Sequence, residues 1–284
     1  KIIANQFSYS MSALRPMQAD KAKGVKGVIY HTIVYAITFL AILPQLVVIY
    51  TSFLETSGGQ VYTGKFSLDN YRNILFNRDL SMITNTYKMG LYAIIVIIVV
   101  GILIAYLTVR KRNTVNSILD TFSMFPFVIP GSVLGIALVY SFSDHPLFLT
   151  GTVTIMVVAF VIRRMPYTIR SSTAIMSQIS PSMEEAAISL GSSEIKTFFK
   201  ITVPLMLPGV LAGAIMSWIT ILGELSASII LYSSNTQTLA VSIYTEVIRG
   251  NFGNASAYSA ILTITSIISL LIFFKLSGKR DVSI

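Results

Sequence analysis

Six long apolar runs, almost free of charged side chains, constrain the fold of this chain more than any other feature of its sequence. They lie at about residues 28–51, 89–109, 121–142, 147–162, 205–230 and 257–276. A helix needs about 20 apolar residues to cross the hydrocarbon core of a bilayer, and each run approaches that length. The runs therefore predict an all-α, polytopic membrane bundle of six transmembrane helices. We expect one transmembrane domain over residues 28–276, with an N-terminal tail at 1–27 and a C-terminal tail at 277–284.

The composition agrees with a membrane protein and excludes several kinds of chemistry. Of the 284 residues, 54% are hydrophobic and only 12% are charged, whereas about a quarter of the residues are charged in a typical soluble domain. The absence of cysteine excludes disulfides, thiolate metal sites and cysteine nucleophiles. The two histidines, His31 and His145, cannot form a zinc site by themselves. We therefore expect this chain to bind no metal and no cofactor.

The formal net charge of +9 is explained by membrane topology. With six spans, both termini share one face of the membrane with the loops that join spans two and three and spans four and five. That face carries sixteen of the 21 lysines and arginines, and the opposite face carries Lys65, Arg72, Arg78, Lys88 and Arg249. Lysine and arginine are enriched in cytoplasmic loops. The sequence thus predicts that both termini are cytoplasmic, and the basic charge requires no nucleic-acid partner.

The loop predicted between spans four and five, at about 163–204, carries signals for two short cytoplasmic helices. The first follows a serine cap at Ser180 and ends at Gly191, which can adopt a left-handed backbone. The second follows the serine pair at 192–193, and we expect it to end before Pro204. Small side chains in the first helix and two phenylalanines in the second would allow another protein to approach closely. The alternative is a connector that packs only on its own bundle.

The residues of this loop follow a specific pattern. Glu185-Ala186-Ala187 is followed after three residues by Gly191 and after nine more by Ile201, with Val203-Pro204 close behind. This pattern resembles the EAA loop of binding-protein-dependent ABC importer permeases of type I (MetI-like), with valine where that family usually has leucine. The resemblance implies a coupling helix pair that sits in a groove of a separate cytoplasmic ATPase, which binds the ATP and magnesium. The ATPase-coupling residues that it implies are Glu184, Glu185, Ala186, Ala187, Gly191, Phe198, Ile201 and Pro204.

Resemblance to the same family extends over most of residues 28–280 and suggests a substrate. The stretches Gly223 to Ala227 and Gln237 to Val241 look most like those of ferric-iron permeases, which are often two fused halves, whereas 284 residues supply one half. Polyamine, thiamine and phosphonate permeases share much of the pattern and stay as alternatives. The resemblance implies a non-enzymatic permease subunit of the bacterial cytoplasmic (inner) membrane, in which ATPase closure drives alternating access. Its implied partners are an ATPase dimer, a second permease half that is identical or homologous, an extracytoplasmic substrate-binding protein and membrane lipids.

Glu224 is the one ionisable residue well inside an apolar run, about twenty residues along the fifth. Because an unpaired charge costs a few kcal/mol at the centre of a bilayer, we expect this side chain to face protein or water. In one interpretation it belongs to the substrate path, with Ser226 and Ser228 as polar neighbours. In the other it is a buried carboxylate that is hydrogen-bonded to an adjacent helix. The sequence leaves both interpretations open.

Two other classes of function fit the sequence less well. A channel or secondary carrier that works without ATP should carry several carboxylates inside the membrane, and here only Glu224 qualifies. An intramembrane enzyme would need cysteines, a metal cluster or paired membrane acids, which the sequence lacks.

Overall fold

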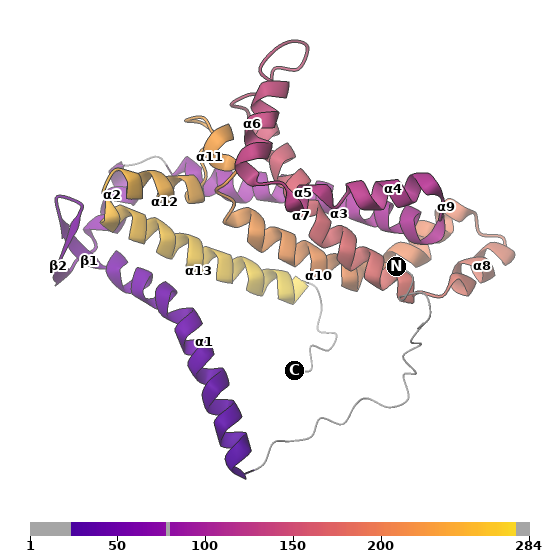
Figure 1. Ribbon diagram of the computed structural model, residues 1–284, viewed down its shortest axis with the longest axis horizontal. Helices are drawn as coiled ribbons and strands as arrows, with labels where there is room; N and C mark the ends of the chain where they lie inside the picture. Colours follow the sequence, from indigo (N-terminus) through magenta and orange to yellow (C-terminus); the bar gives the residue numbers. More distant parts are fainter. Residues whose placement is uncertain (1–23, 78–79, 277–284) are drawn as a thin grey trace. The chain divides into compact units, whose positions relative to one another are not determined.

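The computed structural model describes residues 24–77 and 80–276 (Figure 1). Residues 1–23 and 277–284, which hold most of the two predicted tails, lie outside the described residues. The chain divides into two units, Lys1–Leu46 and Val47–Ile284. Helix α1 (Gly24–Ser52) coincides with the first apolar run, begins in the first unit and ends in the second.

Three long helices form the centre of the second unit. They are α3 (Ser81–Arg110), α7 (Val153–Gln178) and α10 (Val203–Leu222), which pack against one another, and α13 (Phe252–Leu276) packs against α10. Each of them is largely apolar in sequence. The four helices therefore account for most of the second, fourth, fifth and sixth apolar runs.

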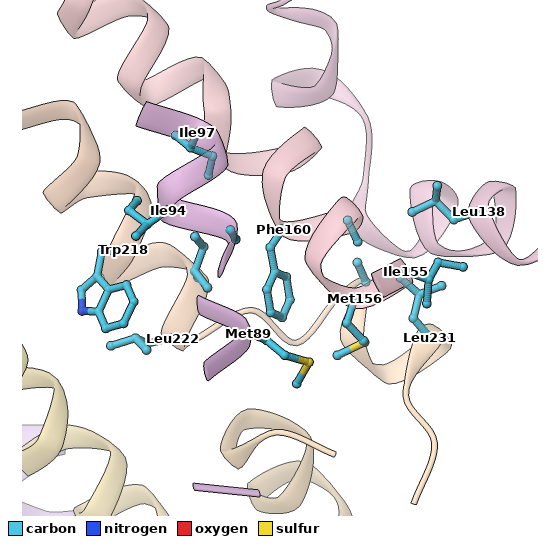
Figure 2. Packing of buried hydrophobic residues seen from close by; sticks show 14 of the residues in the cluster. Met89, Ile94, Ile97, Leu138, Ile155, Met156, Phe160, Trp218, Leu222 and Leu231 are labelled. Carbon is cyan, nitrogen blue, oxygen red and sulfur yellow. The ribbon is translucent and has the colours of Figure 1, made fainter. Parts of the chain in front are cut away.

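The main hydrophobic core lies where α3, α7 and α10 meet. Met89 and Ile97 come from α3, Phe160 from α7 and Trp218 from α10, and Figure 2 shows such side chains gathered around the ring of Phe160. Polar side chains join the helices as well, because the hydroxyl of Ser217 donates to the carbonyl oxygen of residue 164 at 2.8 Å. Such interhelical hydrogen bonds are typical of helices packed within a membrane. The core thus holds α3, α7 and α10 together as one body.

The third apolar run is not a straight span. It is divided among α4 (Thr114–Phe122), α5 (Phe125–Val128) and α6 (Gly131–Ser141), and the two parts meet at an angle of 109°. The break falls at Pro130, because a proline has no N–H to donate and forces an extended backbone on the residue before it. Figure 1 shows α6 directed away from the central helices. The predicted span over 121–142 is therefore a bent pair of helices and not one straight helix.

The fourth and fifth helices differ in length from their apolar runs. Helix α7 continues past Arg163 to Gln178, so residues 163–178 of the predicted loop are helical. Helix α10 ends at Leu222, and a turn and the short helix α11 (Ser228–Leu231) follow it. Among the described residues, four helices are long and apolar enough to cross a membrane, or five if the bent pair is one span. The four are α1, α3, the continuous helix over Glu194–Leu222, and α13. The count of six spans therefore stays a prediction.

The end of the second unit away from α8 and α9 is built from short elements (Figure 1). Strands β1 (Leu54–Ser57) and β2 (Val61–Phe66) form an antiparallel hairpin in which Leu54 pairs with Phe66, and α2 (Asp69–Asn77) follows. Helix α12 (Leu239–Ile248) is capped by Thr238 and lies against α13. The fold is helical as expected, apart from this hairpin, which the apolar pattern did not indicate.

Candidate functional site

The segment between α7 and α10 contains the first candidate site. Helix α8 (Pro181–Ser189) begins at the predicted cap, where the hydroxyl of Ser180 accepts a hydrogen bond from the N–H of Ser182. It ends before Gly191, whose φ of +88° lies in the left-handed region that favours glycine. Helix α9 (Glu194–Thr197) then begins after its cap at Ser193. These boundaries confirm the predicted start and end of the first helix and the start of the second.

The end of the second helix differs from the prediction. Helix α9 does not stop before Pro204 but continues through a π-helical turn, η1 (Phe198–Thr202), directly into α10. In this wider turn the N–H of Val203 donates to the carbonyl oxygen of Phe198. Inside a regular α-helix, the ring of a proline clashes with the carbonyl group four residues earlier. A π-turn spaces its hydrogen bonds five residues apart instead of four, so the backbone just before Pro204 is not that of a regular α-helix. The segment is therefore joined rigidly to α10.

Much of this segment is exposed, and several of its exposed side chains are apolar. Glu185 and Ala186 are exposed on α8, and Leu190, Ile195 and Phe199 are exposed farther along the segment. Of the other predicted coupling residues, Gly191 and Pro204 are exposed, whereas Ala187, Phe198 and Ile201 are half-buried. An exposed surface of small and apolar side chains next to a carboxylate has the chemistry of a docking surface for another protein.

Glu184 differs from its neighbour Glu185 because it points into the protein. Its Oε1 lies 3.0 Å from Nε of Arg110 at the end of α3, and it accepts a hydrogen bond from the hydroxyl of Thr202 at 3.1 Å. A cavity of about 290 Å³ lies beside this contact, between the end of α3 and helices α8 and α9. Sequence reasoning counted Arg110 only as a topology signal. The sequence signal for this contact was the position of Arg110 at the end of a long helix, facing the loop that carries Glu184.

Glu224 is the centre of the second candidate site. It lies in the turn that follows α10, not inside a helix as the sequence suggested, and its side chain is 1% exposed. Its Oε2 lies 3.1 Å from Nε of Arg163 and also pairs with Arg164, while its Oε1 accepts from the N–H of Ala227 at 3.1 Å. Arg163 in turn donates to the carbonyl oxygen of Ile129 at 3.2 Å.

This network joins three elements at the point where the third run breaks. The two arginines belong to α7, the carboxylate follows α10, and the carbonyl directly precedes the break between α5 and α6. The arrangement matches the interpretation of Glu224 as a buried carboxylate held by an adjacent helix. Two adjacent arginines and a single intramembrane acid were the sequence signal for this pairing, and sequence reasoning had used both arginines only for topology.

The two serines predicted beside Glu224 lie in different surroundings. Ser226 is exposed and packs closely on Gly131, and Ser228 is buried with its hydroxyl unpaired among the described residues. The structure therefore does not bring the three predicted substrate-path residues together on one surface. Within residues 24–77 and 80–276 there is also no group of three or more histidine, aspartate or glutamate side chains that could hold a metal ion.

Known relatives share both the sequence pattern and the fold. Residues 97–280 match the family described as binding-protein-dependent transport system inner membrane component. The chain is 32% identical over 239 residues to a ferric transport system permease protein, FbpB, of Actinobacillus pleuropneumoniae, and this match covers 79% of the chain but only 35% of that relative. It is 25% identical over 261 residues to a putative 2-aminoethylphosphonate transport system permease protein, PhnV, of Salmonella choleraesuis, with 92% of the chain and 96% of that relative covered.

Solved structures with the same fold include a bacterial ABC transporter involved in the import of the acidic polysaccharide alginate. That chain superposes with a TM-score of 0.68 at 15% identity, and the match covers 88% of this chain and 94% of the other. A second structure, of the bacterial alginate ABC transporter in complex with an alginate pentasaccharide-bound periplasmic protein, superposes with a TM-score of 0.71 at 17% identity. It covers 89% of this chain and 94% of the other.

These matches agree with the apolar helices of the fold. The chain spans about a third of the length of the ferric relative, and the family match covers more than half of the chain itself. With at least four helices suited to a bilayer, it is a multi-pass membrane protein. The chain belongs to the family of inner-membrane components of binding-protein-dependent transport systems.

Proposed function

We propose that the chain is the permease subunit of an ATP-driven importer in the bacterial inner membrane and that it takes up ferric iron. The observation that supports a coupled permease is the exposed face of α8, where Glu185 and Ala186 lie beside the elbow at Gly191. A separate cytoplasmic ATPase dimer, which binds the ATP and magnesium, would dock on this face. Closure of the ATPases would then move the permease between inward-facing and outward-facing states.

The other partners of the proposed importer follow from the same family membership. A second permease half, identical or homologous, would complete the translocation path, and membrane lipids would surround the outer helices. An extracytoplasmic binding protein would deliver the substrate, and the alginate transporter solved with its periplasmic protein supports a partner of this kind. Both termini would lie in the cytoplasm, with the coupling segment on the same side.

Two relatives favour two different substrates. The ferric-transport relative shares 32% identity, the higher of the two values, which is why we propose ferric iron. The phosphonate-transport relative matches over nearly its whole length, so 2-aminoethylphosphonate is the second candidate. The experiment is uptake into proteoliposomes that contain the complete complex and its binding protein, with radiolabelled ferric iron or 2-aminoethylphosphonate outside. We expect ATP-dependent uptake of iron. Uptake of 2-aminoethylphosphonate alone would show that the phosphonate, and not iron, is the substrate. Uptake without any ATPase would refute the proposed importer.

The docking role of α8 has a direct test of its own. Glu185→Lys reverses the exposed charge on α8 in the proposed docking face, so it should reduce co-purification of the ATPase with the permease about tenfold. The matched control is Asp144→Lys, which makes the same change of charge at an exposed residue between α6 and α7. Equal recovery of the ATPase with both variants would show that the ATPase does not dock on α8.

A further inference from the structure

We propose that Arg110 is the positioning residue that links the coupling segment to α3, so that a movement imposed on α8 is passed to α3 and α10 together. This inference rests on the proposed function, because it assumes that an ATPase moves α8. It assigns Glu184 to an internal contact and leaves Glu185 as the carboxylate for the partner. The two adjacent glutamates would therefore have different tasks.

The geometry brings three elements together on one carboxylate. Glu184 of α8 receives Nε of Arg110 from α3 at 3.0 Å and the hydroxyl of Thr202 from η1 at 3.1 Å. A second guanidinium nitrogen of Arg110 donates to the carbonyl oxygen of Ile179 at 2.8 Å. Ile179 directly precedes the cap of α8, so the guanidinium holds both the first turn of the helix and the backbone that enters it.

Burial separates this contact from an ordinary surface ion pair. The side chains of Arg110 and Glu184 are 11% and 12% exposed. The next ion pair along, between Lys111 and Glu194, has a separation of 3.5 Å and side chains that are 54% and 69% exposed. Solvent screens an exposed pair, whereas a largely buried pair that loses one member leaves the other charge without its partner. The pair of Arg110 with Glu184 is therefore the buried ionic link to α8, whereas Glu194 of the exposed pair belongs to α9.

Few other contacts fix α8 in place. The helix has no fully buried residue, so apolar packing contributes little to its position. The cavity of about 290 Å³ lies against the side of the helix that carries Glu184, so the packing there is incomplete. By contrast, apolar packing joins α9 and η1 to α3. The ring of Phe198 packs edge-on against the ring of Tyr106 on α3, and the two ring centroids are 4.8 Å apart. Among the described residues, the contact between Arg110 and Glu184 is thus the buried ion pair that joins α8 directly to α3.

The experiment measures coupling and docking separately in the complete complex. Arg110→Gln should keep the co-purified ATPase and its basal ATP hydrolysis. Both Arg110→Gln and Glu184→Gln should reduce the stimulation of hydrolysis by the loaded binding protein about tenfold. Because the two residues act through one contact, the double variant should be no worse than either single variant. Arg110→Lys retains the charge but has a single donor nitrogen, which cannot reproduce the fork that binds Glu184 and Ile179, so it should be intermediate. Lys111→Gln is the matched control and should behave as the wild type.

Each result bears on one of the two proposals. Wild-type stimulation in Arg110→Gln, or additive losses in the double variant, would overturn the role of Arg110 and leave the importer intact. Loss of the ATPase from the Arg110→Gln and Arg110→Lys complexes alike would also overturn it, because the contact would then serve only the fold. A wild-type complex that the binding protein does not stimulate would refute the proposed function and this inference with it.

Discussion

At the scale of single residues, Gly191 sets the angle between α8 and α9. A φ of +88° is unfavourable for a non-glycine residue by about 1–2 kcal/mol of conformational free energy. The penalty is largest for β-branched residues. No atom lies within 4 Å of an added Cβ, so the effect of a substitution is conformational and not steric. Gly191→Val should therefore reduce ATPase co-purification and uptake, whereas Gly191→Asn should keep most of both, because asparagine tolerates this backbone. Equal effects of the two substitutions would contradict the role of the elbow.

Glu224 should contribute to the stability of the fold through its ion pairs. Its carboxylate is the counter-charge of Arg163 and Arg164, whose side chains are 14% and 16% exposed. Removing one member of a buried ionic network costs about 3–5 kcal/mol. Glu224→Gln should therefore lower the Tm of the purified chain in detergent by several degrees, and Ser226→Ala, at an exposed residue nearby, should not. An unchanged Tm with lost uptake would favour the substrate-path role instead.

The sequence revealed local features of the site better than its long-range contacts. The serine caps, the glycine elbow and the start of α8 follow from rules that act over a few residues, and they were predicted correctly. The partner of Glu184 lies 74 positions away in sequence and that of Glu224 about 60. Several arginines could have paired with either acid, and only the packing of α3, α7 and α10 selects among them.

At the scale of elements, the break in the third run depends on a close approach between α6 and the turn after α10. A Cβ added to Gly131 would lie 2.6 Å from Cβ of Ser226 and 2.7 Å from a guanidinium nitrogen of Arg163. Gly131→Ala should therefore destabilise the chain by about 1–3 kcal/mol through overpacking. Gly223→Ala is the matched control, since no atom lies within 4 Å of its Cβ. Thermal unfolding in detergent checks both, and equal Tm values would mean that the junction is not tight.

Element boundaries show where apolar patterns fail. Hydropathy located the runs, but it does not distinguish a straight span from one that is broken at Pro130. It also placed Glu224 inside a helix that ends two residues earlier, at Leu222. Proline was misjudged in the opposite direction at Pro204, where a preceding π-turn lets the helix continue. In each case the tertiary environment decides whether the backbone bends or continues.

At the scale of the whole molecule, the uneven distribution of lysine and arginine predicts which end of the bundle faces the cytoplasm. The hairpin and the loop between α3 and α4 should lie on opposite sides of the membrane. The chain has no native cysteine, so single engineered cysteines report accessibility without background. Suitable positions are Phe66, which is 72% exposed in β2, and Thr114, which is exposed at the start of α4.

A membrane-impermeant maleimide should label Phe66→Cys in spheroplasts, because the charge distribution predicts that the hairpin lies outside. Thr114→Cys should react only in inverted vesicles, because the neighbouring Arg110, Lys111 and Arg112 predict that its loop is cytoplasmic. Thr114 lies outside the coupling segment, so a docked ATPase would not be the reason for protection in spheroplasts. The reverse labelling pattern would put α8 and its exposed carboxylate outside the cell, where no ATP is available, and would refute the coupled importer as a whole.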